Sequence, residues 1–230
     1  MVIHILTLFP KMFSGPFDES IVKRAIDKKL VEIKIHNLRD WAIDKRGTVD
    51  DRPYGGGAGM ILRIEPIYNA IKKLKAKNKK LKIILLSPQG ETFNQAKAQE
   101  LAWQEEILFV CGHYEGFDER IRKFVDEEIS IGNFVLTGGE IPAMVITDAI
   151  VRLLPNVLKK EEAIKIESFS PDLKKLIKES ASNVDRYLEY PQYTRPENFH
   201  NLKVPEVLLS GNHKKIQAWQ TKQIKKQNCF

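Results

Sequence analysis

Cysteine is scarce in this sequence of 230 residues, where only Cys111 and Cys229 occur. Two cysteines this far apart do not make a disulfide framework, and no second His or Cys pair completes a zinc site with Cys111 and His113. A run of apolar residues long enough to span a bilayer is also missing, and the apolar start of the chain carries no basic flank or cleavage signal. We therefore expect a soluble, cytoplasmic protein that makes no membrane contact.

Negative charge is in the minority, with 30 acidic against 37 basic residues, a net charge of +7 and a pI near 9.2. This balance favours a polyanionic partner such as nucleic acid, although many basic proteins bind none. No acidic residue follows Gly211, and a helix predicted over 212–226 carries five lysines beside His213 and Trp219. A face of one charge is usually only solvated, but next to an aromatic ring it equally indicates RNA contact.

Short β-branched runs alternate with helical patterns along the first two thirds of the chain. They predict strands over 2–9, 31–36, 82–86, 107–111 and 129–136, and helices over 18–28, 66–75, 94–103, 117–125 and 141–154. The alternation indicates an α/β fold with a parallel sheet covered by helices. After Pro155 the composition turns polar. We expect a main domain over 1–158, a linker with one short helix over 159–190, and a small, mainly helical domain over 191–230.

Glycine is concentrated in two kinds of segment. The run 55–59 lacks the Gly-Lys-Ser/Thr ending of a phosphate loop and the spacing of a dinucleotide fingerprint, so on its own it is best read as a mobile loop. Arg52 and Tyr54 beside it keep a role in RNA contact open. Three further segments, 86–90, 112–116 and 131–140, each follow a predicted strand. Because ligands sit at the carboxyl ends of parallel strands, we expect the three to form one pocket.

Several motifs in this order resemble those of the bacterial TrmD family, the tRNA (guanine-N1)-methyltransferases of the SPOUT class. They are Thr48-Val49-Asp50-Asp51-Arg52-Pro53-Tyr54-Gly55-Gly56-Gly57, Leu86-Ser87-Pro88-Gln89-Gly90, Gly112-His113-Tyr114-Glu115-Gly116, Ser130-Ile131-Gly132, Gly138-Gly139-Glu140-Ile141-Pro142-Ala143, Tyr193-Thr194-Arg195-Pro196 and Leu209-Ser210-Gly211-Asn212-His213. The resemblance spans nearly the whole chain. It implies a deep trefoil knot, which general topology rules treat as exceptional, and a homodimer with the active site between subunits.

The resemblance also implies S-adenosyl-L-methionine as cofactor and tRNA as substrate, with methylation at N1 of the guanine just 3′ of the anticodon, guanine 37, preceded by guanine 36. Mg²⁺ is implied as a second cofactor, although the sequence offers no evident ligand cluster for it. The matching cofactor-binding positions are Leu86, Ser87, Pro88, Gly112, Tyr114, Glu115, Ile131, Gly132, Asn133, Phe134, Val135, Leu136, Gly138, Gly139 and Pro142.

Methylation at N1 of guanine needs a general base, because that nitrogen carries a proton at neutral pH, and a cation to stabilise the charge that grows on O6. By resemblance these groups are Glu167 and Arg152. Without it, Arg152 would be read as a cation at a helix end and Glu167 as a solvated charge. The family has Asp where this chain has Glu167, and the following stretch is longer than usual and holds Asp185, a second candidate base.

RNA contact is expected from Arg52, Tyr54, Arg120, Ser168, Asn212 and His213, and the C-terminal domain is shorter than the family pattern. Two alternatives stay open. One is a SPOUT enzyme that acts on ribosomal RNA or on a ribose hydroxyl, against which the 52–57 loop and the 193–196 segment argue. The other is an RNA-binding homologue without activity, which the Asp-to-Glu change and the short C-terminal domain make conceivable.

Overall fold

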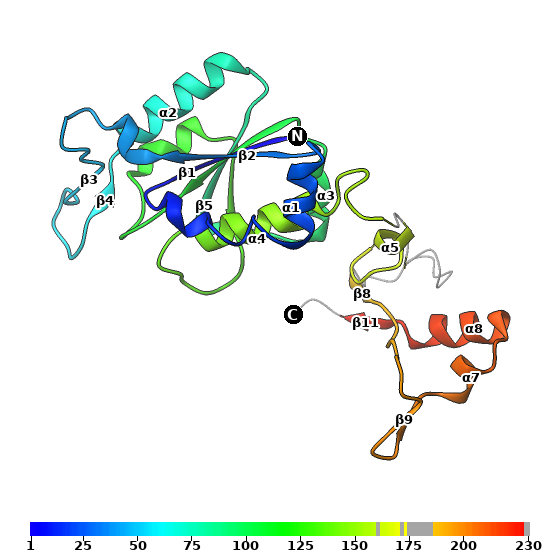
Figure 1. The fold of residues 1–230 in the computed structure, drawn as a ribbon. Coiled ribbons are helices and arrows are strands. Elements are labelled where there is room, and N and C mark those ends of the chain that lie inside the picture. Colours follow the sequence, from blue (N-terminus) through cyan, green and yellow to red (C-terminus); the bar gives the residue numbers. More distant parts are fainter. Residues whose placement is uncertain (160–161, 171–172, 174–185, 228–230) are drawn as a thin grey trace. The chain divides into compact units, whose positions relative to one another are not determined.

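The computed structural model describes residues 1–159, 162–170, 173 and 186–227 (Figure 1). Asp185, the second candidate base, lies outside these residues. The chain divides into two units, Met1–Lys159 and Lys160–Phe230. None of the helices in the described residues is long and apolar enough to cross a membrane. The finer division into a main domain, a linker and a terminal domain stays a prediction.

A five-stranded parallel sheet forms the centre of the N-terminal unit, as the alternating pattern predicted. Its strands are β1 (Val2–Thr7), β2 (Glu32–Asn37), β5 (Lys82–Thr92), β6 (Glu106–Cys111) and β7 (Glu127–Ser130). Their spatial order is β2-β1-β6-β5-β7, and all neighbouring pairs are parallel. The carboxyl ends of β5, β6 and β7 therefore meet at one edge of the sheet.

Helices cover both faces of this sheet (Figure 1). The α-helices of the N-terminal unit are α1 (Ser20–Asp27), α2 (Ile64–Lys77), α3 (Gln95–Ala102) and α4 (Glu140–Val151), and the 3-10 helices are η1 (Pro10–Phe13), η2 (Leu38–Trp41) and η3 (Glu119–Phe124). Successive strand residues point to opposite faces, so each strand contributes to two cores. In β6, for example, Phe109 packs with α1, α3 and α4, whereas Leu108 packs with α2 and η3.

Five predicted elements differ from the structure in type or by three or more residues at one end. β5 continues to Thr92 instead of ending at residue 86, and α4 ends at Val151 instead of at residue 154. The strand expected over 129–136 ends at Ser130, because the Ser130 hydroxyl accepts from Gly132 N and donates to Gly132 O, and these local bonds replace the strand ladder. The segment expected as a helix over 117–125 is the 3-10 helix η3, whose start is capped by Asp118. The last helix ends at Gln223 rather than at residue 226, and residues 225–227 pair as a strand.

The described residues of the C-terminal unit form short elements. They are α5 (Glu162–Lys165), β8 (Arg186–Leu188), β9 (Asn198–Phe199), β10 (Leu202–Lys203), α7 (Glu206–Leu209), α8 (His213–Gln223) and β11 (Lys225–Gln227). The antiparallel pairs β9–β10 and β8–β11 were not expected from the sequence. The pair β3 (Asp50–Asp51) and β4 (Ile61–Leu62), which flanks the glycine run of the N-terminal unit, was likewise missed. Strands of two or three residues are too short to show a periodic pattern.

Candidate functional site

A cavity of about 480 Å³ lies at the carboxyl ends of β5, β6 and β7, a size typical of small-molecule sites. The three loops predicted to converge do line it together. Its lining residues are Leu86, Ser87, Pro88, Gln89, Gly112, His113, Tyr114, Glu115, Gly116, Phe117, Glu119, Arg122, Ile129, Ser130, Ile131, Phe134, Val135, Leu136, Thr137, Gly138, Gly139 and Pro142. Gly132 and Asn133 are the two predicted cofactor-binding residues that lie outside this set.

The loop after β6 is held to the glycine-rich segment by backbone hydrogen bonds. Glu115 N donates to Met60 O at 3.0 Å, and Leu62 N donates to Gly116 O at 2.9 Å. Tyr114, the residue before Glu115, has a φ of +57°. A non-glycine residue seldom adopts this conformation, and such residues cluster at functional sites. The loop that lines the cavity and the loop expected to face RNA thus share one framework.

The start of α4 approaches the end of β6 very closely. Gly139 N donates to Gly112 O at 2.8 Å, and a Cβ added at Gly139 would lie 2.7 Å from Cys111 Cα. Only glycine leaves room for this backbone contact. Next to it the buried carboxylate of Glu140 accepts a 2.7 Å hydrogen bond from the buried Thr7 hydroxyl, 133 residues away in the chain. Thr7 therefore links the start of α4, next to the cavity residue Gly139, to the end of β1.

Cys111 lies in the core at the end of β6, and His113, two residues later, lines the cavity. Burial, together with the nearby carboxylate of Glu140, raises the pKa of the Cys111 thiol, which keeps it uncharged and unreactive. His113 packs edge-on against the rings of Phe9 and Tyr114, and its buried Nδ1 has no hydrogen-bond partner among the described residues. A buried nitrogen of this kind at a cavity wall suits a polar ligand atom.

The lining fits S-adenosylmethionine in chemical terms. Leu86, Ile129 and Pro142 offer apolar surface for the adenine base, and backbone groups of the glycine-rich turns are available for hydrogen bonds. The carboxylates of Glu115 and Glu119 lie at the same cavity and would attract a ligand that carries sulfonium and ammonium charges. Within the described part of the chain, no group of three or more His, Cys, Asp or Glu residues is placed to hold a metal ion.

The two predicted catalytic residues belong to different units. Arg152 is half-buried at the C-cap of α4, where its backbone N–H donates to Asp148 O at 3.2 Å. Glu167 is half-buried in the C-terminal unit, and its carbonyl oxygen accepts from Ser170 N at 3.1 Å. The next two residues are hydrogen-bonded to β8 and the residue after it. Phe169 N donates to Tyr187 O, and the Ser168 hydroxyl accepts from Glu189 N.

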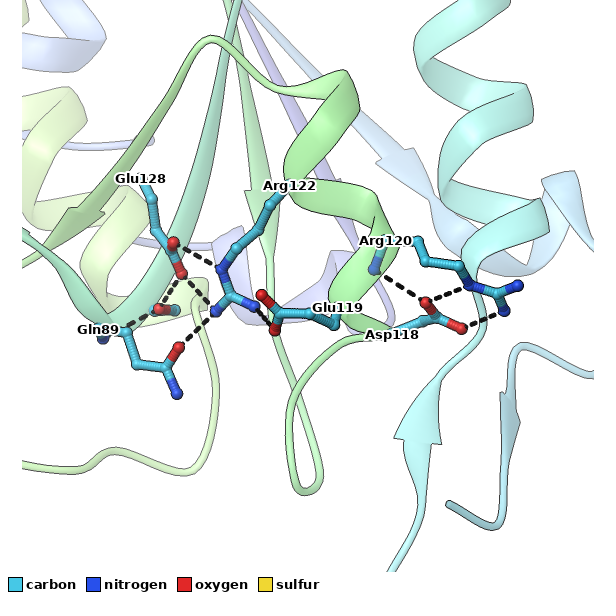
Figure 2. Close-up of polar contacts among 7 residues, drawn as sticks. Gln89, Asp118, Glu119, Arg120, Arg122 and Glu128 are labelled. Carbon is cyan, nitrogen blue, oxygen red and sulfur yellow. Dashed lines mark hydrogen bonds and ion pairs between the residues drawn. The ribbon is translucent and has the colours of Figure 1, made fainter. Parts of the chain in front are cut away.

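The other residues expected to contact RNA are mostly exposed. Tyr54 is fully exposed in the β3–β4 loop, and Arg52 lies beside it. Arg120 makes two hydrogen bonds to Asp118 (Figure 2), which raise its pKa, and so its guanidinium is already engaged. In the C-terminal unit Asn212 caps α8 by accepting from Lys215 N, and His213 is the first, exposed residue of that helix.

Six polar residues of the cavity wall were not among the predicted cofactor-binding residues: Gln89, His113, Glu119, Arg122, Ser130 and Thr137. Gln89 stood in a recognised motif but had no role, whereas Glu119 and Arg122 gave no signal, because the pattern of η3 does not show which side faces the sheet edge. Figure 2 shows Arg122 between Glu128, Gln89 and Glu119, with each contact drawn as a dashed line.

The chain is similar to known proteins over nearly its whole length. The family model described as tRNA (Guanine-1)-methyltransferase TrmD matches residues 1–229. Proteins named tRNA (guanine-N(1)-)-methyltransferase from Citrifermentans bemidjiense and Dictyoglomus turgidum are 54% and 51% identical over 224 residues, which cover 97% of this chain and 84% and 85% of theirs. The crystal structure of tRNA (m1G37) methyltransferase from Aquifex aeolicus superimposes with a TM-score of 0.76 at 40% identity, over 96% of this chain and 88% of that one. The chain belongs to the TrmD family of tRNA (guanine-N1)-methyltransferases.

Proposed function

We propose that this protein transfers a methyl group from S-adenosyl-L-methionine to N1 of guanine 37 in tRNA, next to the anticodon and after guanine 36. The observation that carries the proposal is the cavity at the ends of β5, β6 and β7, in a chain that matches the methyltransferase family from residue 1 to residue 229. The family match favours this activity over a SPOUT enzyme that acts on another RNA target, and the methyl-transfer assay below separates it from an inactive RNA-binding homologue. The proposal includes a cytoplasmic location, where tRNA is modified.

In this proposal the cofactor supplies an electrophilic methyl group on a sulfonium. The loops 86–89, 112–116 and 131–139 hold it through backbone groups, and Gly132 and Asn133 shape the turn that carries Phe134 into the cavity wall. Glu115 favours its positive charge. Because the protein forms no covalent bond to the substrate, positioning supplies much of the rate.

The guanine must lose the N1 proton before N1 becomes a competent nucleophile. The Glu167 carboxylate accepts that proton, so the N1–H bond breaks as an O–H bond forms on the glutamate. The guanidinium of Arg152 donates to O6, where negative charge grows during this loss. The N1 electron pair then bonds to the methyl carbon, and the electrons of the breaking C–S bond stay on sulfur. Glu reaches one methylene further than Asp, and Asp185 is the alternative base.

An exposed apolar surface supports the proposal that the protein works as a homodimer. Phe134, Val135 and Leu136 of the cavity wall are 54%, 82% and 36% exposed, and Ile141 and Val145 on one face of α4 are 46% and 45% exposed. Large apolar side chains that are exposed in this number favour association. With the catalytic pair divided between two units, a dimer gives a route by which Glu167 of one subunit serves the cavity of the other. The trefoil knot and a requirement for Mg²⁺ belong to the same proposal.

Recognition of tRNA would draw on both units. Tyr54 offers a ring for base stacking and Arg52 a phosphate partner, while Ser168, Asn212 and His213 offer polar contacts from the C-terminal unit. The exposed lysines of α8, Lys214, Lys215 and Lys222, add positive charge beside the ring pair Tyr193–Trp219, whose centroids lie 6.3 Å apart. Arg120 would contribute only after it exchanges Asp118 for a phosphate.

The test is single-turnover methyl transfer to an unmodified tRNA transcript, followed by nucleoside analysis for 1-methylguanosine. Wild-type protein should form it, and Glu167→Gln should abolish transfer while cofactor affinity stays nearly unchanged. Glu167→Asp, which restores the family residue, is the matched control and should retain transfer. Near-normal transfer by Glu167→Gln would reject Glu167 as the base and favour Asp185, and Asp185→Asn would then be the inactive variant.

A further inference from the structure

The wall of the cavity contains a stretch of β5 that leaves the sheet. β5 pairs with β7 at Leu86, departs, and returns at Glu91, and both of these residues face Ile129. The excursion 87–90 contributes Ser87, Pro88 and Gln89 to the cavity. It returns through Gly90, where an added Cβ would lie 2.4 Å from Ile129 N. Residues outside the strand ladder need other contacts to keep one conformation.

Side-chain bonds from outside the excursion provide those contacts (Figure 2). Arg122 of η3 donates from Nε to Glu128 at 2.8 Å and from a terminal nitrogen to the other Glu128 oxygen at 2.9 Å. The same terminal nitrogen donates to the Gln89 amide oxygen at 2.6 Å. Ser87 donates to Glu128 at 2.5 Å and accepts from Gln89 N at 3.0 Å. Both polar side chains of the excursion thus end on one ion pair.

The ion pair is well suited to hold the excursion in place. Side-chain exposure is 25% for Arg122 and 19% for Glu128, so solvent screens the pair less than a surface salt bridge. Burial alone would raise the pKa of Glu128, but hydrogen bonds from Arg122 and Ser87 bring it below its ordinary value. The carboxylate therefore stays ionised at neutral pH. Two-point contact between a guanidinium and a carboxylate fixes orientation as well as distance.

We infer that Arg122, paired with Glu128, is a positioning residue for the cofactor, which holds the excursion 87–90 in the conformation that binds S-adenosylmethionine. The inference rests on the proposed function, because the ligand of the cavity is the methyl donor. The excursion lines the cavity, but Glu128 does not. Any effect of Glu128 on a bound ligand therefore has to pass through its contacts with Ser87 and Arg122. Loss of the pair lowers the fraction of molecules whose excursion is competent to bind, and the apparent affinity falls by the same factor.

The experiment measures the dissociation constant of S-adenosylmethionine by isothermal titration calorimetry without RNA. Arg122→Met should weaken binding about tenfold, as expected when a loop loses a charge-assisted contact. Glu128→Gln should weaken it in the same direction, and the double variant should be no weaker than Arg122→Met, because both changes break one network. Arg122→Lys should fall between, since a lysine cannot bond Glu128 twice and also reach Gln89.

Arg63→Met is the matched control. Arg63 also pairs with a carboxylate, Glu65, and its side chain is 30% exposed, but it does not line the cavity. It should leave the dissociation constant unchanged. In methyl transfer, Arg122→Met should raise KM for the cofactor and leave the single-turnover rate at saturating cofactor close to wild type.

Three results would overturn the inference. The first is an unchanged dissociation constant in Arg122→Met, and the second is an equal loss in Arg63→Met. The third is a loss in Arg122→Met with none in Glu128→Gln, which would mean that Arg122 contacts the ligand directly. Absence of binding in the wild-type protein would instead count against the proposed function, so the two failures are distinguishable.

Discussion

Two threonines are completely buried in the N-terminal unit, and they differ in their hydrogen bonding. Thr7 donates to the Glu140 carboxylate at 2.7 Å and accepts from Phe9 N at 2.9 Å. Thr147, inside α4, has a buried hydroxyl without a partner among the described residues. Replacing each by valine keeps the size and branching of the side chain and removes only the hydroxyl. The two variants therefore separate the value of the hydrogen bond from that of the volume.

The expected effects have opposite signs. Thr7→Val removes the hydrogen bond to the buried Glu140 carboxylate, which is worth about 1.5–3 kcal/mol, and the weaker bond from Phe9 N. The free energy of unfolding should therefore fall by about 2–4 kcal/mol. Thr147→Val replaces an unsatisfied buried hydroxyl by a methyl group, so stability should stay constant or rise by up to about 1 kcal/mol. Because Glu140 begins α4 next to Gly139, Thr7→Val should also weaken cofactor binding, whereas Thr147→Val should not.

The assay is urea unfolding followed by tryptophan fluorescence. A Trp219→Phe background leaves Trp41 and Trp103, both in the N-terminal unit, as the reporters. A change in midpoint at constant slope reports stability alone. Equal destabilisation by the two valine variants would contradict this prediction, since it would show that the Thr7–Glu140 hydrogen bond contributes nothing beyond the loss of any buried hydroxyl.

Two further changes test the start of α4 beside the cavity and the edge strand β2. Gly139→Ala should weaken S-adenosylmethionine binding at least tenfold, because the added Cβ would lie 2.7 Å from Cys111 Cα and 2.8 Å from Gly112 N. Backbone atoms cannot move aside as a flexible side chain does. Unchanged affinity in calorimetry would contradict this prediction. Burial lowers the pKa of His36 to about 4, from 6.5 in the unfolded chain. As the pH falls, the unfolded state is therefore protonated first. The stability present above pH 6.5 should decline as the pH falls towards 4. His36→Gln should flatten this decline in urea unfolding, and equal pH dependence in both proteins would count against it.

Much of the architecture could be predicted because buried parallel strands leave a clear pattern. Runs such as Ile107–Cys111 predicted the sheet, and the small residues that follow them predicted the cavity, since parallel strands bring their carboxyl ends to one edge. The last helix ended early because residues 225–227 pair with the distant strand β8. The end of β7 was decided by local hydrogen bonds. Ser130 ended β7 through bonds to Gly132, which a hydrophobic pattern cannot show.

The side-chain contacts that shape the cavity could not be predicted, because they join distant parts of the chain. Thr7 and Glu140 are 133 residues apart, and Arg122 meets Gln89 across 33. Each looks like an ordinary residue of its own element until the fold brings the partners together. The roles of Glu167 and Arg152 came from the family resemblance alone, since neither residue stands out chemically in the sequence.

We expect methyl transfer to N1 of guanine 37 when guanine 36 precedes it. The protein is supplied with labelled S-adenosylmethionine and with two unmodified tRNA transcripts that differ only in having guanine or adenine at position 36. 1-Methylguanosine should form at position 37 of the guanine-36 transcript, and very little should form in the other. Methylation of another base or of a ribose hydroxyl, or no methylation of either transcript although the cofactor binds, would contradict this expectation.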